Sequence, residues 1–201
     1  MVSNEEISVN KRNGRGKESL QIDKIHAMVG FATEGITGVS ASHVEMNSGI
    51  QLFDGISTAD IQQILIKSAN DLITLESPNY QYVAARLLLF SLRKQLFHRL
   101  WDHPKLIDHI KKLIEMGLYD KDILVNYDES EIDRMDMWID HERDYNFTYA
   151  GLRQVMDKYL VQDRSTGDIF ETPQFMYMMI SATLFAQYPK DKRMSYVKKY
   201  Y

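Results

Sequence analysis

VNKRNGRGKESLQIDK, residues 9–24, is the stretch that decides how the chain begins to fold. Asn13-Gly14 is a two-residue turn signal, and the residues on either side of it predict a β-hairpin. Asp23 lies where its side chain can cap a following helix. Taken alone, the stretch favours an ordinary solvated hairpin, although short flexible cations beside a helix start also suit a polyphosphate. The cations around the turn and the helix start are Lys11, Arg12, Lys17 and Lys24.

Apolar side chains recur at three- and four-residue spacing after the hairpin, as amphipathic helices require. Gly35 and the Asp54-Gly55 pair mark breaks between these segments. The pattern predicts a mainly α fold in which a small β-hairpin or sheet caps a four-helix bundle over residues 1–100. The four predicted helices cover residues 22–34, from Ser40 or Ser42 to about 52, from Ser57 or Thr58 to about 73, and 79–100.

Residues 101–201 predict a further helical region that begins after a junction at Trp101–Pro104. A turn at Ser165–Asp168 predicts a second short β-hairpin over residues 160–171. The last residues, KRMSYVKKYY, form a polar basic run to which the pattern assigns no element. The predicted helices of this region cover residues 105–116, 130–141, 149–159 and 174–187.

Composition removes several classes of function. The chain has 201 residues, Cys 0 and a formal net charge of -4. Without cysteine it holds no disulfide, thiolate metal site or catalytic thiol. Its charge gives no field to attract nucleic acid or an acidic membrane surface. No apolar run approaches the ~20 residues of a membrane span and the N-terminus shows no secretion signal, so we expect a cytoplasmic protein.

Other kinds of site have little support in the sequence. The 6 histidines form no HxxxH or HExxH pattern, so no metal site is predicted. The carboxylates around His141 fit a helix-end charge cluster better than a metal site. Neither a phosphate-binding glycine loop nor a serine nucleophile elbow occurs. The residues alone therefore indicate a soluble, helix-rich protein with one candidate anion site and no assigned reaction.

Several segments, in order, carry a family resemblance. VNKRNG with QIDKIHAMVGFATEG, DGISTADIQQILIKSANDLI and PNYQYVAARLLLFSLRK resembles the ATP-cone domain at the start of ribonucleotide reductase large subunits. GLYDKDIL, IDHERDYNFTYAGLRQVMDKYLVQ and GDIFETPQFMYM resemble the helical region that follows the cone in class Ia large subunits of enterobacteria and T-even-like phages. The likeness implies two domains: residues 1–100 as the ATP cone, and residues 101–201 as the N-terminal helical region of the large subunit.

The resemblance implies that the cone binds ATP or dATP, with Mg²⁺, as an allosteric effector of overall activity. Its lysines would neutralise phosphates, and Thr58 would add a hydroxyl and free helix amides. Glu18, Leu20 and Gln21 would hold the adenine edge. Phe90 would pack near the base or the sugar. The implied nucleotide site consists of Lys11, Arg12, Glu18, Leu20, Gln21, Lys24, Ile25, Thr58, Gln62, Phe90 and Lys94.

Three departures from the family pattern affect this expectation. Gln21 stands where Asn is common, and Gln62 stands where His is usual. The hairpin turn at Arg15–Lys17 is one residue longer than the similar pattern. Because Gln62 lies one helical turn after Thr58, we expect both side chains to face the nucleotide. A Gln amide cannot become cationic as His can, so we expect weaker inhibition by dATP than in relatives with His.

The family's reaction is an oxidoreductase chemistry that converts ribonucleotides to deoxyribonucleotides in a downstream barrel, with one radical cysteine and two electron-donating cysteines. Since the chain has Cys 0, the resemblance implies that it holds no catalytic residue and no catalytic cofactor. We therefore expect the N-terminal portion of a large subunit, inactive alone, whether an expressed piece, a split-gene product or a partial sequence. The implied partners are the remainder of the large subunit (on the same or a separate chain), a radical-generating small subunit, and a second large subunit in a dimer.

Two other functions stay open. A free-standing regulatory module of helical type would bind nucleotide without belonging to an enzyme. ATP cones occur in this way in a bacterial transcriptional repressor, but that protein carries a cysteine zinc ribbon, which Cys 0 removes here. An all-helical binding module would bind no nucleotide at all. A thermal shift with ATP distinguishes the module that binds no nucleotide from the other two functions. A ligand at a hundred times its Kd adds ~2.7 kcal/mol to the free energy of unfolding, whereas a module without a nucleotide site shows no shift.

Overall fold

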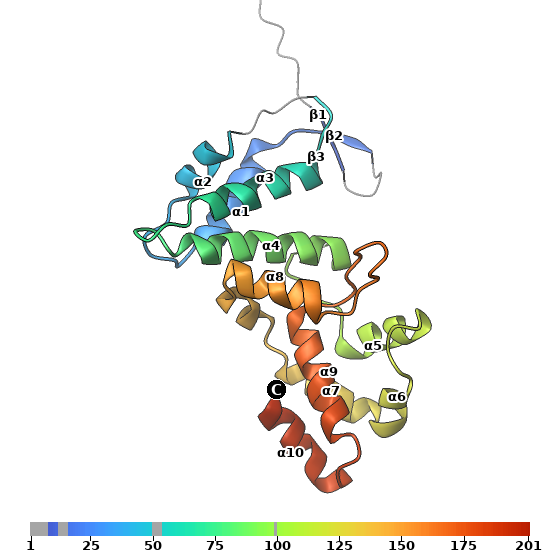
Figure 1. Cartoon of the computed structure of the whole chain (residues 1–201). Coiled ribbons are helices and arrows are strands. Elements are labelled where there is room, and N and C mark those ends of the chain that lie inside the picture. The colour runs from blue at the N-terminus through green and yellow to red at the C-terminus, as the bar shows by residue number, and fades with distance from the viewer. Residues whose placement is uncertain (1–7, 12–15, 50–53, 99) are drawn as a thin grey trace, which may run out of the picture. The chain divides into compact units, whose positions relative to one another are not determined.

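The computed structural model describes residues 8–11, 16–49, 54–98 and 100–201 (Figure 1). Within these ranges the chain is mainly helical, with ten α-helices and one small sheet, which confirms the predicted fold class. Contacts between residues divide the chain into two units. The first is Met1–Ser91 with Tyr145–Leu152, and the second is Leu92–Asp144 with Arg153–Tyr201. The domain boundary at residue 100 stays a prediction.

The first unit begins with a three-stranded sheet in the order β2-β1-β3. Strand β1 (Ser8–Asn10) runs antiparallel to β2 (Lys17–Ser19) and parallel to β3 (Ile56–Ser57). The central strand buries Val9. The two strands of the predicted hairpin are confirmed, whereas its turn at Asn13-Gly14 lies outside the described residues.

A turn before β3 fastens this strand to β1. Asp54 accepts hydrogen bonds from the Ser8 amide at 3.0 Å and from the Ser8 hydroxyl at 2.5 Å. Gly55 adopts φ +85°, a left-handed conformation that favours glycine, and its amide donates to the Ser8 carbonyl at 2.8 Å. The side-chain amide of Asn10 donates to the Gly55 carbonyl at 2.6 Å. The sequence predicted the Asp54-Gly55 turn but not the short parallel strand that follows it.

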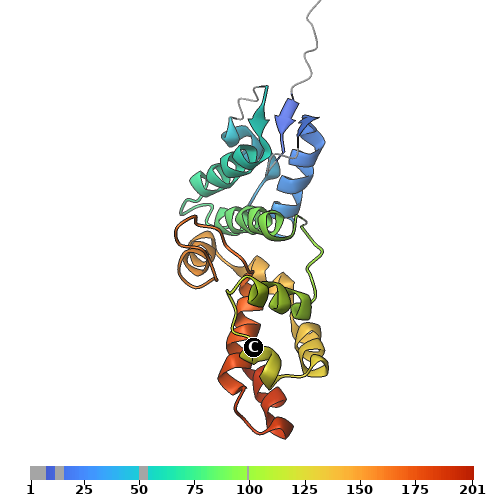
Figure 2. The ribbon, with the colours of Figure 1, turned by 90° about the vertical axis from the view of Figure 1, so that its right-hand side faces the viewer.

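Four helices follow in the predicted order, and Figures 1 and 2 show the strands at one end of the first unit and α4 at the other. Helix α2 stops at Ser48 because Gly49 takes a left-handed conformation (φ +50°), so it is shorter than predicted within the described residues. Ser57, one of two predicted caps, caps α3. The helices are α1 (Ile22–Thr33), α2 (Ala41–Ser48), α3 (Thr58–Asp71) and α4 (Tyr80–Phe97), of which α4 continues past Ser91 into the second unit.

The second unit is a set of helices around its own apolar core. The buried side chains of the core come from five of these helices and include Leu106, Ile110, Ile123, Ile132, Met135, Phe175, Met178, Met194 and Val197. The helices are α5 (Leu106–Glu115), α6 (Asp122–Asn126), α7 (Glu129–Trp138), the later part of α8 (Tyr149–Lys158), α9 (Pro173–Phe185) and α10 (Lys190–Tyr200). No helix in the described ranges is long and apolar enough to cross a membrane.

Helix α10 was not predicted, because its sequence is a basic run with few apolar residues. In the structure it buries Met194 and Val197, and it also buries Arg193. The Arg193 guanidinium pairs with the buried Glu131 carboxylate, donating from Nε to Oε1 at 3.0 Å. Glu131 also closes a capping box with Asp128 at the start of α7. The charge of Arg193 is thus compensated inside the unit, which a periodicity of apolar residues does not reveal.

The predicted second hairpin is reduced to one bridge. Gln162 and Ile169 pair in antiparallel fashion, and the Gly167 amide donates to the Asp163 carbonyl at 2.7 Å across the turn. The polar side chains of this turn bond to one another rather than to a second strand, as Asp163 does with Ser165. The turn prediction is therefore confirmed, while the strands are too short to be assigned as such.

Three histidines pack inside the second unit. The rings of His103 and His141 stack with centroids 3.7 Å apart, and His109 stacks on Phe175 at 4.3 Å. Burial lowers the pKa of His103 and of His109 to about 4, and that of His141 to about 3. The His141 ring therefore packs on aromatic neighbours as a neutral group, which differs from the expected helix-end charge cluster.

The pKa of His109 predicts a pH dependence of stability. A lowered pKa in the folded state means that the neutral ring stabilises the fold fully above pH 6.5, and that this stabilisation is lost as pH falls toward the folded-state pKa of about 4. We expect His109→Phe to remove this loss. Between about pH 7 and about pH 4.5, the variant should gain ~2–3 kcal/mol of unfolding free energy relative to the parent. Urea titrations of the parent and the variant at the two pH values measure these unfolding free energies. If the difference between parent and variant is the same at both pH values, the low pKa assigned to His109 is wrong.

Candidate functional site

Charged side chains from two strands and one helix meet at the sheet of the first unit. Lys11 follows β1 directly, Glu18 is the middle residue of β2 and lies opposite Val9, and Lys24 lies in the first turn of α1. The Lys11 ammonium is 2.9 Å from Glu18 Oε2, and the Lys24 ammonium is 3.9 Å from the same oxygen. The hydrogen bond from Lys11, aided by the charge of Lys24, lowers the pKa of Glu18. Glu18 thus pairs with two lysines, and the side chains of Lys11 and Lys24 remain accessible.

The start of α1 borders this cluster. Gln21 is the N-cap, in an extended conformation, and among the described residues its side chain makes no capping hydrogen bond. Asp23, the predicted cap, instead lies in the first turn of the helix, where its charge suits the positive end of the helix dipole. The side chain of Leu20 is half-buried and that of Ile25 is buried. The Lys24 amide donates to the Gln21 carbonyl at 3.1 Å, and the amides of Ile22 and Asp23 precede it in the first turn.

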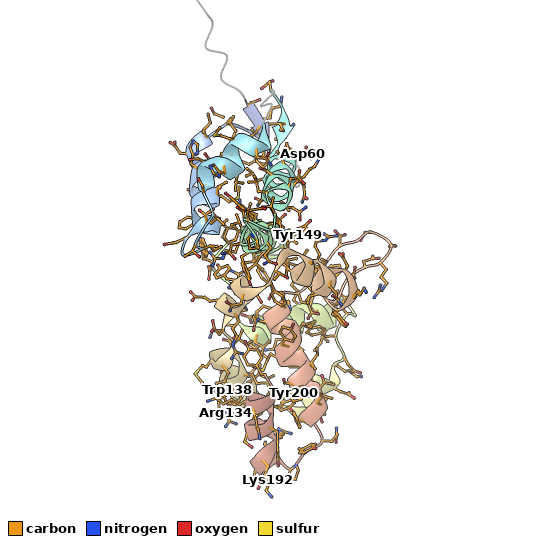
Figure 3. The ribbon with its side chains drawn as sticks, turned by 60° about the vertical axis from the view of Figure 1, so that its left-hand side comes forward. Asp60, Arg134, Trp138, Tyr149, Lys192 and Tyr200 are labelled. Carbon is orange, nitrogen blue, oxygen red and sulfur yellow. The ribbon has the colours of Figure 1, made fainter. Side chains whose placement is uncertain are left out.

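A second helix start lies after β3. Thr58 is the first residue of α3 and is half-buried. Ser57 accepts a hydrogen bond from the Asp60 amide at 3.0 Å and donates its hydroxyl to Asp60 Oδ2 at 2.6 Å. Asp60, labelled in Figure 3, is exposed at this helix start. Ser57 rather than Thr58 supplies the cap, so the Thr58 hydroxyl is not needed for that role.

Two predicted site residues are packed inside the protein. Gln62 is only 1% exposed, and its Nε2 donates to the Leu87 carbonyl of α4 at 3.0 Å. Phe90 is also 1% exposed and meets the Tyr145 ring edge-to-face, with centroids 6.3 Å apart. Gln62 thus packs toward α4, which differs from the expected position facing the nucleotide beside Thr58, while its contact with nucleotide stays a prediction. In this position Gln62 supplies no geometric reason for an altered response to dATP.

The remaining predicted residues lie elsewhere. Arg12 lies outside the described residues. Lys94 is in the last turn of α4, half-buried, and belongs by contacts to the second unit. The structure therefore brings Lys11, Glu18 and Lys24 into one cluster. Across the described ranges, no group of three His, Asp or Glu side chains is arranged to hold a metal ion.

Comparison with known proteins identifies both parts of the chain. Residues 7–95 match the ATP cone domain, and residues 145–201 match the all-alpha domain of ribonucleotide reductase. The chain is 48% identical over 198 residues to the ribonucleoside-diphosphate reductase subunit alpha of Haemophilus influenzae. The chain belongs to the ribonucleotide reductase alpha-subunit family. The cluster at the sheet and the start of α1 thus lies within the ATP cone.

Other relatives agree with this assignment. Identity is 47% over 198 residues to the ribonucleoside-diphosphate reductase 1 subunit alpha of Escherichia coli, and 42% over 195 residues to the subunit alpha of Enterobacteria phage T4. These matches cover 98% and 97% of the chain. The chain spans about a quarter of the length of these relatives, 26% and 25% respectively. The bacterial or phage type inferred from the sequence is confirmed.

The buried amide of Gln62 makes a stability prediction for the ATP cone. Gln62→Ala removes the hydrogen bond to the Leu87 carbonyl and leaves a small cavity between α3 and α4. We expect it to lower the unfolding free energy by ~1–3 kcal/mol. The adjacent Gln63 is exposed, so Gln63→Ala is the matched control and should change stability by less than about 0.5 kcal/mol. Equal effects of the two variants in urea titrations contradict the packed position of Gln62.

Proposed function

We propose that the ATP cone of this chain binds ATP or dATP, accompanied by Mg²⁺, as the allosteric effector of a ribonucleoside-diphosphate reductase. The observation that carries the proposal is the cluster of Lys11, Glu18 and Lys24, which joins two strands to the uncapped start of α1. Accessible lysine ammonium groups beside a helix N-terminus are suited to a polyphosphate. The matches to the ATP cone and to reductase alpha subunits support this ligand.

The proposed contacts combine this cluster with the residues that the family resemblance implies. Phosphates lie against Lys11 and Lys24, and a bound triphosphate competes with Glu18 for the Lys11 ammonium. The adenine edge lies against Glu18, Leu20 and Gln21, next to the first turn of α1. Arg12, Thr58 and Lys94 supply further phosphate contacts. Ile25, Gln62 and Phe90 are buried, so in this proposal they act as packing residues of the cone.

We further propose that the whole protein reduces ribonucleoside diphosphates to deoxyribonucleotides. The chain has Cys 0, so the thiols that such a reduction needs come from the remainder of the large subunit. The proposed partners are that remainder, a radical-generating small subunit and a second large subunit, in the cytoplasm of a bacterium or a phage-infected cell. The match of residues 145–201 to the reductase all-alpha domain favours this assignment over a free-standing nucleotide-binding regulator.

Substitution of two lysines tests the nucleotide site. Lys11→Ala and Lys94→Ala should each weaken ATP binding by ~1.5–3 kcal/mol, the usual range for a charge-assisted hydrogen bond. That loss corresponds to roughly a 10- to 150-fold higher Kd in calorimetry. Lys67 is exposed on α3, and Lys67→Ala is the control that should bind like the parent. If both test variants bind ATP with parental affinity, the phosphate site has been misplaced.

The activity of the chain alone tests whether the catalytic thiols come from the remainder of the large subunit. We expect it to bind ATP and yet to reduce no ribonucleotide when a radical-generating small subunit is added, because no thiol is present to hold the radical or to donate electrons. A reductase assay that follows deoxyribonucleotide formation is the measurement. Turnover without any further part of the large subunit would overturn this prediction.

A further inference from the structure

A short segment of the later sequence belongs to the first unit. Residues Tyr145–Leu152 cluster with Met1–Ser91, although their neighbours on both sides, Asp144 and Arg153, belong to the second unit. The match to the reductase all-alpha domain begins at residue 145. The first residues of that domain are therefore packed on the ATP cone, and peptide bonds join them at both ends to the second unit.

Arg86 holds this segment and the end of α1 at the same time. Its Nη1 donates to the carbonyl of Glu34 at 2.6 Å and to that of Ala32 at 3.4 Å. These carbonyls lie at the C-terminal end of α1, where a cation also suits the helix dipole. The same guanidinium lies over the Tyr145 ring, 5.6 Å from its centroid. One turn further along α4, Phe90 packs edge-to-face on that ring.

The contact of Arg86 with the end of α1 and with Tyr145 lies beside open space. A surface pocket of about 420 Å³, largely open to solvent, lies beside Arg86 and is bordered by residues 35–37, Asn79, Tyr82, Tyr145 and Asn146. Interiors packed at full density resist small displacements. Here Arg86 and Tyr145 border a solvent-filled pocket, so the guanidinium can follow a displacement of the α1 carbonyls without pushing into a filled core.

Helix α1 connects the Arg86 contacts to the cluster of Lys11, Glu18 and Lys24. It has 12 residues and so extends ~18 Å as a rigid element. Gln21 and Lys24 lie at its first turn, and the carbonyls that Arg86 binds lie at its other end. A ligand that moves or orders the first turn therefore changes the position or mobility of the acceptors for Arg86.

We propose that Arg86 is a positioning residue that couples nucleotide binding at the start of α1 to the segment Tyr145–Leu152. The proposal rests on the proposed nucleotide site. Binding changes the C-terminal end of α1, the Arg86 guanidinium follows its two carbonyl acceptors, and the Tyr145 ring follows the guanidinium. Because residues 145–152 continue directly into the second unit, the nucleotide state is passed on along the chain.

Amide hydrogen exchange on the whole chain tests the coupling. In the parent, saturating ATP should slow exchange of the amides of residues 146–152 by about fivefold or more, the lower end of coupling between sites. Arg86→Met keeps the aliphatic stem but removes the hydrogen bonds and the charge. It should keep its calorimetric ATP affinity and the slowing at the start of α1, while the slowing at residues 146–152 falls below about twofold. Arg164→Met, at an exposed turn, is the control and should respond like the parent.

A second pair of variants guards against loss of folding. Tyr145→Phe keeps the ring that Arg86 covers and should keep the response, whereas Tyr145→Leu should lose it. An unchanged response in both Arg86→Met and Tyr145→Leu overturns the coupling. So does a parent that binds ATP without any change at residues 146–152. A parent that binds no ATP overturns the proposed function instead, which calorimetry detects separately.

Discussion

Pairing of β1 with strands on both of its sides is the constraint on which the proposed site depends. The strand is only three residues long, and it is held by burial of Val9 and of Ile56 in the neighbouring β3. Its register places Val9 opposite Glu18, which brings Glu18 Oε2 within 2.9 Å of the Lys11 ammonium. A slip of one residue would turn Glu18 to the other face of the sheet. The charge cluster is therefore a consequence of strand register.

Helix α1 connects the charge cluster at the sheet to the rest of the first unit. Its first turn borders the cluster through Lys24, and its last carbonyls are bound by Arg86 of α4. Helix α4 in turn packs on α3 through the hydrogen bond from Gln62 to Leu87, and on Tyr145 through Phe90. A small sheet, a rigid helix and a buried polar contact thus connect an accessible edge to a segment of the all-alpha domain.

Much of this architecture was predictable because it depends on local signals. The two strands of the hairpin and the order of the first four helices follow from turn residues, caps and apolar periodicity, as Ser57 at the start of α3 illustrates. Strand β3 has two residues, which is too few to show a period. Helix α10 was missed because Arg193 takes a buried position that a count of apolar residues treats as exposed.

The candidate site likewise includes residues whose positions follow from local sequence and residues whose positions depend on distant contacts. Lys11, Glu18 and Lys24 are close in sequence, so their proximity follows from the hairpin and the helix after it. Gln62 was placed on the accessible side by its spacing from Thr58 alone. Its actual position is set by a hydrogen bond to the Leu87 carbonyl of α4, which lies 25 residues further along the chain. Likewise, no local pattern shows that Tyr145 packs with Arg86, since the contact joins residues far apart in the sequence.

The most direct test of the account is a structure of the chain with ATP and Mg²⁺ bound. We expect phosphate oxygens within hydrogen-bond distance of the Lys11 and Lys24 ammonium groups, with the base beside Glu18 and Gln21. We also expect contact with phosphate to replace, at least partly, the present contact between Lys11 and Glu18 at 2.9 Å. Nucleotide bound away from the sheet and the start of α1, with this ion pair unchanged, would contradict it.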